Sequence, residues 1–519
     1  MASLNKYSGA WNTGHTAHLF RRTTYGVKYD LIKEYGAKSL DATIALLFTP
    51  LQQPAPPINI NYATDPNVPI GQTWVDKATS MNVDGYRTQT LRAWSYDLML
   101  SGTPNIREKM VMFLHNHFVT ADINEPRYEY KNIALLRSRA LGNFKQLTYD
   151  VTIDPGMLEY LNGNLNTKSA PNENYARELL ELFTVGKGPI AGPGDYTTYT
   201  EGDIKEIAKV LTGWKDQRGA VPITSQFNLN LHDTTTKKLS ARFNNVSISN
   251  SGINEYKELI DNIFNKEEVS LHICRRLYVW FVASNISSEI ERDIIIPLAK
   301  IFRDSNYELL PTIKTLLESD HFYDVCTRGV MVKNPLDFLL NPLSQFDVTL
   351  PTDAVLRMQV LNNIYNTSVF HQMAMFRAPS VAGWQAFYQE PNYYKLWLNS
   401  VSLPSRKTYT DVIAGTGQTI GSFRLQLNIL NTVNKFLKPE DAGSVVNEIG
   451  VLLFAKALAP NQVTLLKSIL AEGTSDAGWT TAYNAYKAAP TDTTKLNTVV
   501  TRLRSMVTYM MRMPEYHLS

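Results

Sequence analysis

Apolar residues recur every three to four positions along most of this 519-residue chain, and this helical period limits the fold more than any other feature. It predicts helices at 13–24, 86–100, 106–119, 255–266, 268–283, 307–318 and 444–470. Alternation typical of strands is confined to residues 216–254, which are rich in Asn, Thr and Ser. We therefore expect a mainly α, multi-helix globular protein with a small irregular or β-containing insertion near 216–254, in which helix exceeds strand by at least about two to one.

Loops rich in Pro, Asn and Gly interrupt this helical pattern. Residues 51–75 are expected to form one such loop, and residues 403–422 another. We expect a main helical body over 1–401, which contains the loop at 51–75 and the insertion at 216–254, and a C-terminal helical segment over 425–519 packed on that body. A chain of this length is several times the size of a usual domain, which permits about two to four structural units.

The charge balance bears on the partners to expect. The sequence has 51 Lys and Arg against 48 Asp and Glu, a net charge of +3, which gives no support for a nucleic-acid or membrane-surface role. No window reaches the roughly 18 apolar residues of a membrane span, and the first 26 residues lack the apolar core of a secretory signal. We expect no nucleic-acid partner, no membrane span and a cytoplasmic location, with export by another route left open.

The chain has two cysteines, Cys274 and Cys326. Two are too few for a four-cysteine zinc site or a disulfide framework. Cys274 lies in the largely apolar stretch 271–282, so we expect two buried free thiols, although a single disulfide stays open.

Capping residues mark two helices. Asn172 is expected to cap a helix that runs to Val185 and stops at Gly186, where a left-handed residue ends a helix. Thr200 and Asp203 have the spacing of a capping box at the start of the next helix.

Several segments together resemble the bacterial "domain of unknown function 1800" family. They are HLFRRTTYG at 18–26, REKMVMFLHNHF at 107–118, PNENYARELLELFTVG at 171–186 and YTEGDIKEIAKVLTGW at 199–214. Weaker similarities are FNLNLHD at 227–233 with Lys237, KNP at 333–335, PSVAGW at 379–384 and the ending MPEYHLS. The resemblance runs in order along most of the chain and implies no settled activity. It implies a sulfatase-like partner protein, since genes of the two families often lie side by side. Many relatives have FWHNHF where this chain has Leu114, which argues against an essential indole there.

Two histidines stand two residues apart in the second of these segments. On a regular helix His115 and His117 lie about 200° apart, so they bind one metal only if the chain leaves the helix or forms a strand. His117 shares a stripe with Met110 and Phe113 and is expected to point inward. The alternative is a core histidine hydrogen-bonded to the backbone.

Two glutamates, Glu178 and Glu181, share one face of the helix expected after Asn172, beside an apolar stripe. Helical bundles present metal ligands in this way, with histidines from a neighbouring helix. The alternative is a solvated acidic face that includes an i,i+4 pair between Glu173 and Arg177.

Further imidazole and guanidinium groups have two readings each. His232 stands next to Asp233 in an irregular stretch, where a carboxylate can set the tautomer of an imidazole, or where both residues form a surface turn. His18 beside the Arg21–Arg22 pair is placed to bind an anion or, as we favour, to anchor the first helix. Arg406 is placed to hold an acidic substrate or to serve at the surface.

These residues support two hypotheses from different classes. The first is a metal-dependent enzyme, a hydrolase in preference to an iron-dependent oxidoreductase, since Gly-x-Ser-x-Gly and HExxH are absent and a mixed nitrogen and oxygen site suits zinc, manganese or iron. Its expected metal ligands are His115, His117, Glu178 and Glu181, and its expected catalytic residues are Glu178, His232 and Asp233. The second is a non-catalytic helical scaffold or partner-binding protein with a buried polar network. In both we expect His117, Glu178 and at least one of His115, Glu181 and His232 to line a single cavity.

Overall fold

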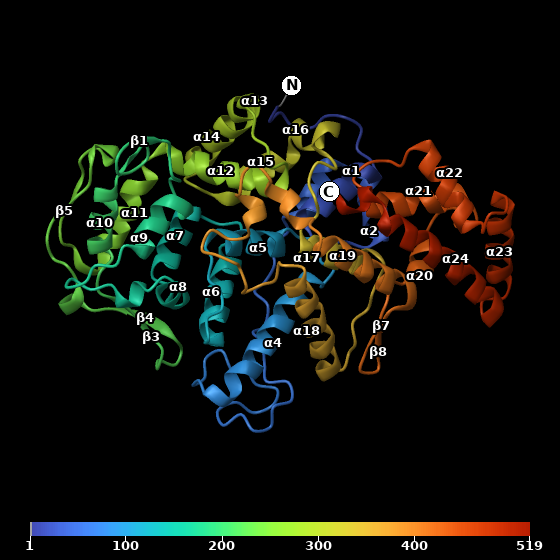
Figure 1. Ribbon diagram of the computed structural model, residues 1–519, viewed down its shortest axis with the longest axis horizontal. Coiled ribbons are helices and arrows are strands. Elements are labelled where there is room, and N and C mark those ends of the chain that lie inside the picture. The colour runs from blue at the N-terminus through green and yellow to red at the C-terminus, as the bar shows by residue number, and fades with distance from the viewer. Residues whose placement is uncertain (1–2) are drawn as a thin grey trace.

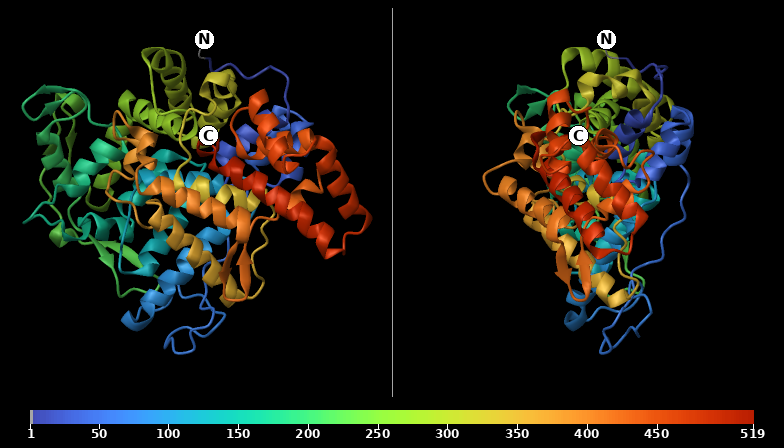
Figure 2. Two further views of the ribbon diagram at one scale, coloured as in Figure 1. Left: turned by 45° about the vertical axis from the view of Figure 1, so that its right-hand side comes forward. Right: turned by 90° about the vertical axis from the view of Figure 1, so that its right-hand side faces the viewer.

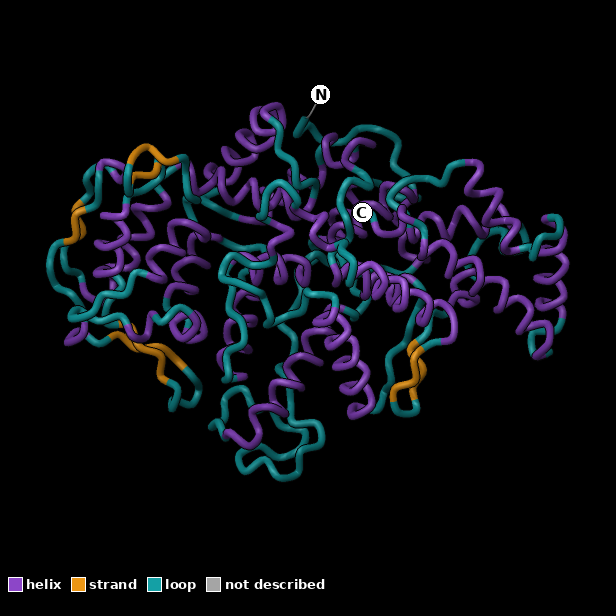
Figure 3. The backbone as a smooth tube through the Cα atoms, viewed as in Figure 1, coloured by secondary structure: helices purple, strands orange, loops and turns teal. Residues whose placement is uncertain are grey.

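Helices contain more than half of the residues in the computed structural model, which describes residues 3–519 (Figure 1). Within those residues strands occur as four separate two-stranded antiparallel sheets, which Figure 3 shows as short orange hairpins at the edges. The mainly α fold class predicted from the helical period is thereby confirmed.

The helices up to residue 210 are α1 (Thr13–Thr23), α2 (Tyr29–Gly36), α3 (Leu40–Leu47), α4 (Met81–Met99), α5 (Arg107–His117), α6 (Pro126–Ser138), α7 (Phe144–Thr152), α8 (Pro155–Tyr160), α9 (Asn174–Glu178) and α10 (Glu201–Val210). The later helices are α11 (Glu255–Phe264), α12 (Glu267–Phe281), α13 (Ser288–Ile290), α14 (Ile296–Asp304), α15 (Leu309–Glu318), α16 (Asp320–Tyr323), α17 (Pro335–Gln345), α18 (Ala354–Phe370), α19 (Ser402–Asp411), α20 (Ile429–Val433), α21 (Ala442–Leu453), α22 (Pro460–Leu470), α23 (Asp476–Ala488) and α24 (Thr493–Arg512).

Shorter elements join these helices. The paired strands are β1 (Ile190–Gly192) with β2 (Asp195–Tyr196), β3 (Trp214–Gln217) with β4 (Thr224–Phe227), β5 (Lys237–Lys238) with β6 (Ser247–Ile248), and β7 (Gln418–Ile420) with β8 (Phe423–Leu425). The π-helical turns are η2 (Leu179–Phe183), η6 (Glu291–Ile295) and η10 (Val412–Thr416). The 3-10 turns are η1 (Gly163–Leu165), η3 (Leu229–Leu231), η4 (Ala241–Phe243), η5 (Gly252–Asn254), η7 (Val325–Thr327), η8 (Gln385–Phe387), η9 (Tyr393–Trp397) and η11 (Pro514–His517).

Local sequence signals set several of these boundaries. Asn12 caps α1 by accepting a hydrogen bond from His15 N, and the basic last turn of α1 suits the negative end of the helix dipole. The capping box of α10 forms as predicted, with Thr200 and Asp203 each bonded to the other's backbone N–H. The insertion at 216–254 contains β4, β5 and β6, as its alternation predicts.

Two predictions about order and burial are wrong. Residues 403–422, expected to be a loop, form α19, η10 and the start of the β7–β8 hairpin. Arg406 and Thr410 are fully buried in α19, so tertiary packing stabilises a helix whose polar sequence shows little apolar period. Cys326, expected to be buried, is exposed on η7, whereas Cys274 is buried as predicted, and both thiols are free.

The N- and C-terminal parts of the chain pack on each other. Buried apolar residues form one main core that extends along the chain from Ala17 to Tyr516. α1 contacts α21, so the first helix lies against the C-terminal helices, as Figures 1 and 2 both show. α10 and α11 lie at the opposite end of the molecule, with α5 near its centre (Figure 1). None of the helices described between residues 3 and 519 is long and apolar enough to cross a membrane.

Candidate functional site

His117 is the last residue of α5 and is buried among aromatic rings. Its Nε2 lies 3.0 Å from the carbonyl oxygen of Phe183. A carbonyl only accepts hydrogen bonds, so the ring donates from Nε2. Burial, with Arg276 as the next cause, lowers the pKa of His117 well below its ordinary value, so the ring is neutral near pH 7. The inward orientation predicted for His117 is confirmed.

The carbonyl that His117 binds belongs to a π turn at the end of α9. The last carbonyls of a helix have no partner within the helix and need one elsewhere. In η2 the carbonyl of Leu182 accepts from His272 Nε2 at 2.9 Å, and the carbonyl of Phe183 accepts from His117. Two histidines from two other helices, α12 and α5, therefore cap this turn.

Gly186 ends the capped turn as predicted, with a left-handed φ of 73°. Its N–H donates to the carbonyl of Leu180 at 2.9 Å. A Cβ added at Gly186 would lie 2.7 Å from Nδ1 of His272. Glycine is thus required here both by the backbone and by the close approach of the capping ring.

His115 faces a different part of the chain. Its Nε2 accepts a hydrogen bond from the backbone N–H of Phe376 at 3.1 Å, which leaves the ring proton on Nδ1. The neighbouring Asn116 Oδ1 accepts from the backbone N–H of Trp384 at 2.9 Å. Gly383, at φ 87°, passes so close that an added Cβ would lie 2.6 Å from the carbonyl oxygen of Asn116. Burial lowers the pKa of His115 to about 4.

Three segments that carry the family resemblance therefore meet at the end of α5. His115 and Asn116 hold the segment that contains 379–384, and His117 holds the segment 171–186. We call His115, Asn116 and His117 the junction. Each of its three side chains bonds to a backbone group of another segment.

The two glutamates lie on the partly exposed side of α9 and η2. Glu181 accepts from the hydroxyl of Tyr199 at 3.0 Å and pairs with Lys187 at 3.4 Å. Glu178 forms no hydrogen bond or ion pair with any residue that the structure describes. Burial and then repulsion from Glu181 raise its pKa. The predicted pair of Glu173 with Arg177 is confirmed at 3.4 Å, and Arg177 also pairs with Glu201 at 2.8 Å.

His232 sits in a separate, fully buried group. Its Nε2 lies 3.2 Å from Glu255 Oε1, its Nδ1 lies 2.9 Å from the carbonyl of Thr212, and Lys237 Nζ lies 2.6 Å from Glu255 Oε2. Asp233 is partly exposed and bonds to Thr235. The sequence pattern did not single out Glu255, which begins α11 as an apparently ordinary first-turn acid. The sequence did indicate Lys237, the ion-pair partner of Glu255, because Lys237 belongs to the family resemblance.

The predicted site residues do not come together. His117, Glu178, Glu181 and His232 share no hydrogen bond or ion pair in residues 3–519. Over the same residues no group of three or more His, Cys, Asp or Glu side chains is placed to hold a metal ion. The single shared cavity expected from the sequence is therefore not found, and a metal at these residues stays a prediction.

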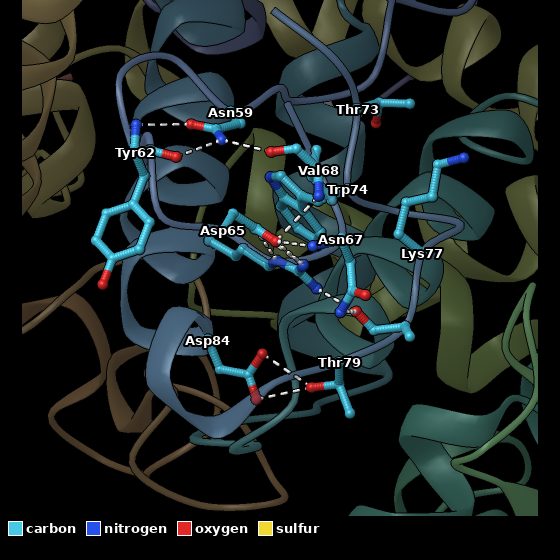
Figure 4. Close-up of polar contacts among 12 residues, drawn as sticks. Asn59, Tyr62, Asp65, Asn67, Val68, Thr73, Trp74, Lys77, Thr79 and Asp84 are labelled. Atoms are coloured by element: carbon cyan, nitrogen blue, oxygen red, sulfur yellow. Dashed lines mark hydrogen bonds and ion pairs between the residues drawn. The ribbon is translucent and has the colours of Figure 1, made fainter. Parts of the chain in front are cut away.

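The long loop expected at 51–75 is ordered by its own buried ion pair. Asp65 accepts from the backbone N–H groups of Asn67 and Val68 and pairs with Arg87 of α4 at 2.9 Å (Figure 4). Asn59 bonds to the carbonyls of Tyr62 and Val68, both at 2.8 Å, on the other side of the same loop. These contacts hold the loop in place without any regular secondary structure.

A second group of buried polar residues gathers near α1. Lys109 pairs with Asp337, the carboxylate closest to this group, while Arg22 donates to Phe281 O at 2.9 Å and to Ser519 Oγ at 2.7 Å. Lys333 and Arg406 form no ion pair with any residue between 3 and 519. Burial lowers the pKa of Arg22 and of Arg406 to about 10. Cations thus outnumber acids in this group of buried residues.

His18 anchors α1, as the sequence favoured. Its Nε2 donates to the carbonyl of Phe322 at 3.1 Å, and its ring packs against that of Phe322. His272, His321 and His371 also bind backbone or side-chain groups of neighbouring segments.

The fold and these contacts define a helical protein in which segments that carry the family resemblance contact one another through buried polar side chains. The chain belongs to the family described as "Protein of unknown function (DUF1800)", whose sequence model matches residues 18–518. No curated protein and no solved structure matches the chain.

Proposed function

We propose that this chain is a non-catalytic helical scaffold in which the histidines of the family segments join distant parts of the backbone. The observation that carries this proposal is the pair of ring contacts in the junction, His117 Nε2 to Phe183 O and Phe376 N to His115 Nε2. Both contacts span more than sixty residues of sequence, and both satisfy backbone groups that would otherwise be buried without a partner.

The metal-dependent hydrolase is the competing proposal. In that case His117 would bind zinc, manganese or iron through Nδ1, whose lone pair has no protein partner, whereas His115, which is protonated on Nδ1, would have to give up the hydrogen bond from Phe376 to bind the metal through Nε2. Glu178 and Glu181 would have to move toward these buried atoms from the partly exposed face of their helix. The scaffold needs no such movement, and for this reason we favour it.

A pair of substitutions at His117 tests the scaffold directly. In His117→Gln the side-chain amide keeps a donor near the position of Nε2, whereas His117→Leu keeps the volume and leaves the carbonyl of Phe183 unpaired. We expect His117→Leu to lower the free energy of unfolding by about 1–3 kcal/mol more than His117→Gln, as measured by denaturant unfolding. An equal decrease in the free energy of unfolding in the two variants would mean that the hydrogen bond to Phe183 is not the source of the stability that His117 contributes.

A further inference from the structure

A cavity of about 430 Å³ lies beside α1. It is lined by Gly14 and Arg21 of α1, by η7 with the residue that follows it, and by the end of α21 with the segment 454–458. Its size falls within the range of small-molecule sites, about 300–1,000 Å³.

The charged residues that line this cavity all have the same sign. They are Arg21, Arg328 and Lys456, and no acidic side chain is among the described residues that line it. Arg21 and Arg328 form no ion pair with any residue from 3 to 519. The sequence has nearly equal numbers of acids and bases, so a cavity with three cations and no acid is not a result of overall composition.

Arg21 is almost completely buried and has unused hydrogen-bonding capacity. It donates from Nη2 to the carbonyl of Val451 at 2.8 Å, while Nε, which protein encloses, and Nη1 have no partner in the described chain. Arg328 is arranged in the same way, with Nη2 donating to the carbonyl of Tyr323 at 2.6 Å and Nε unpartnered. Burial, followed by repulsion from Arg22 and Arg328, lowers the pKa of Arg21 to about 10. Buried guanidinium groups without a carboxylate are costly, and a bound anion would remove that cost.

The rest of the wall is mostly apolar. Val451 and Phe454 come from the end of α21 and the segment after it, and Leu458 and Val325 complete this side of the cavity. Such a wall favours an apolar group and disfavours a strongly hydrated dianion, whose desolvation costs more than that of a monoanion.

We propose that this cavity binds an amphipathic carboxylate, with the carboxylate on Arg21 and Arg328 and the apolar tail against Val451, Phe454 and Leu458. Lys456, which is exposed, stands at the rim and attracts the anion from solvent. The site is independent of the junction, because none of the junction residues lines it.

Calorimetric titration of the full chain with octanoate tests the site. We expect saturable binding of one octanoate per chain. Acetate lacks the tail and 1-octanol lacks the charge, so we expect each to bind at least tenfold more weakly. Octyl phosphate has the same tail with a larger charge and should also bind more weakly. Absence of octanoate binding, or binding of 1-octanol as tight as that of octanoate, would overturn the proposal. Tighter binding of octyl phosphate would overturn the assignment to a carboxylate.

Variants of the two arginines locate the binding. Arg328→Gln is the main variant, because Arg328 is only partly buried, and Arg21→Met is the second. We expect each to weaken octanoate binding at least tenfold. Arg424→Gln is the matched control, since Arg424 is an exposed arginine of β8 that does not line the cavity. Unchanged affinity in a folded Arg328→Gln, or an equal loss in Arg424→Gln, would contradict the site.

Discussion

At the residue scale, three buried histidines, His115, His117 and His272, act as neutral hydrogen-bonding groups. His117 and His272 donate from Nε2 to carbonyls, and His115 accepts from a backbone N–H. Burial is the first cause of the lowered pKa in all three rings. A histidine can thus be essential to packing in a segment whose sequence looks like a metal-binding motif.

This neutral state makes the stability of the protein depend on pH. The pKa of His115 is about 4 in the folded chain, against an ordinary value of 6.5, so between these values the unfolded chain binds more protons. Its contribution to stability is therefore complete above about pH 6.5 and is lost as the pH falls toward 4, by at most about 3 kcal/mol. Unfolding of the wild type and of His115→Gln, whose amide oxygen can still accept from Phe376, measures this contribution. We expect similar stability at pH 7.5 and a smaller loss in the variant at pH 4.5. Identical pH profiles would show that His115 does not titrate in this way.

At the scale of the element, α9 and η2 lie in the segment 171–186, one of the four that carry the family resemblance. The helix widens to a π turn over Leu179–Phe183, its freed carbonyls are capped by α5 and α12, and Gly186 reverses the chain. A π turn alters the spacing of side chains, so the face that Glu178 and Glu181 share on a regular helix does not place them beside the histidines.

Gly186→Ala tests whether the close packing of the His272 ring against Gly186 stabilises this element. Its φ of 73° is nearly equal to the 75° of Gly473, which has open space around it, so Gly473→Ala measures the cost of the left-handed backbone alone. We expect about 1–2 kcal/mol for Gly473→Ala, and at least about 1 kcal/mol more for Gly186→Ala, because the new Cβ displaces His272 from Leu182. The excess should disappear when both glycine variants are made in a His272→Ala background, as a double-mutant cycle measures. If Gly186→Ala is still more destabilising than Gly473→Ala in the His272→Ala background, displacement of the His272 ring is not the cause of the difference.

At the scale of the whole molecule, the sequence predicts the helices well and the meeting of distant segments poorly. The apolar periods at 13–24 and 106–119 give α1 and α5 to within two residues at each end, although both helices are buried on all sides over residues 16–23 and 109–117. The polar α19 is missed, because its stability depends on contacts such as Arg406 with Lys333, which lie far apart in sequence.

The same reason explains the candidate site. The sequence predicts that His117 is buried, since that follows from its stripe, but it does not reveal that Phe183 rather than Glu178 is the partner. Glu255 is identified as the partner of His232 and of Lys237 only in the folded structure, although Lys237 itself belongs to the family resemblance. A sequence pattern can indicate that a buried polar residue needs a hydrogen-bond partner, but the tertiary structure determines which group that partner is.

We propose that His115 and His117 join backbone segments, and a metal held by these two rings is the competing proposal. The most direct test between the two is the metal content of the purified full-length chain, measured by mass spectrometry for zinc, manganese and iron after supplying each metal and removing the excess. We expect far less than one equivalent of any of these metals, and no change in the variant carrying both His115→Gln and His117→Gln. One tightly held equivalent in the wild type that is lost in this double variant would contradict our proposal.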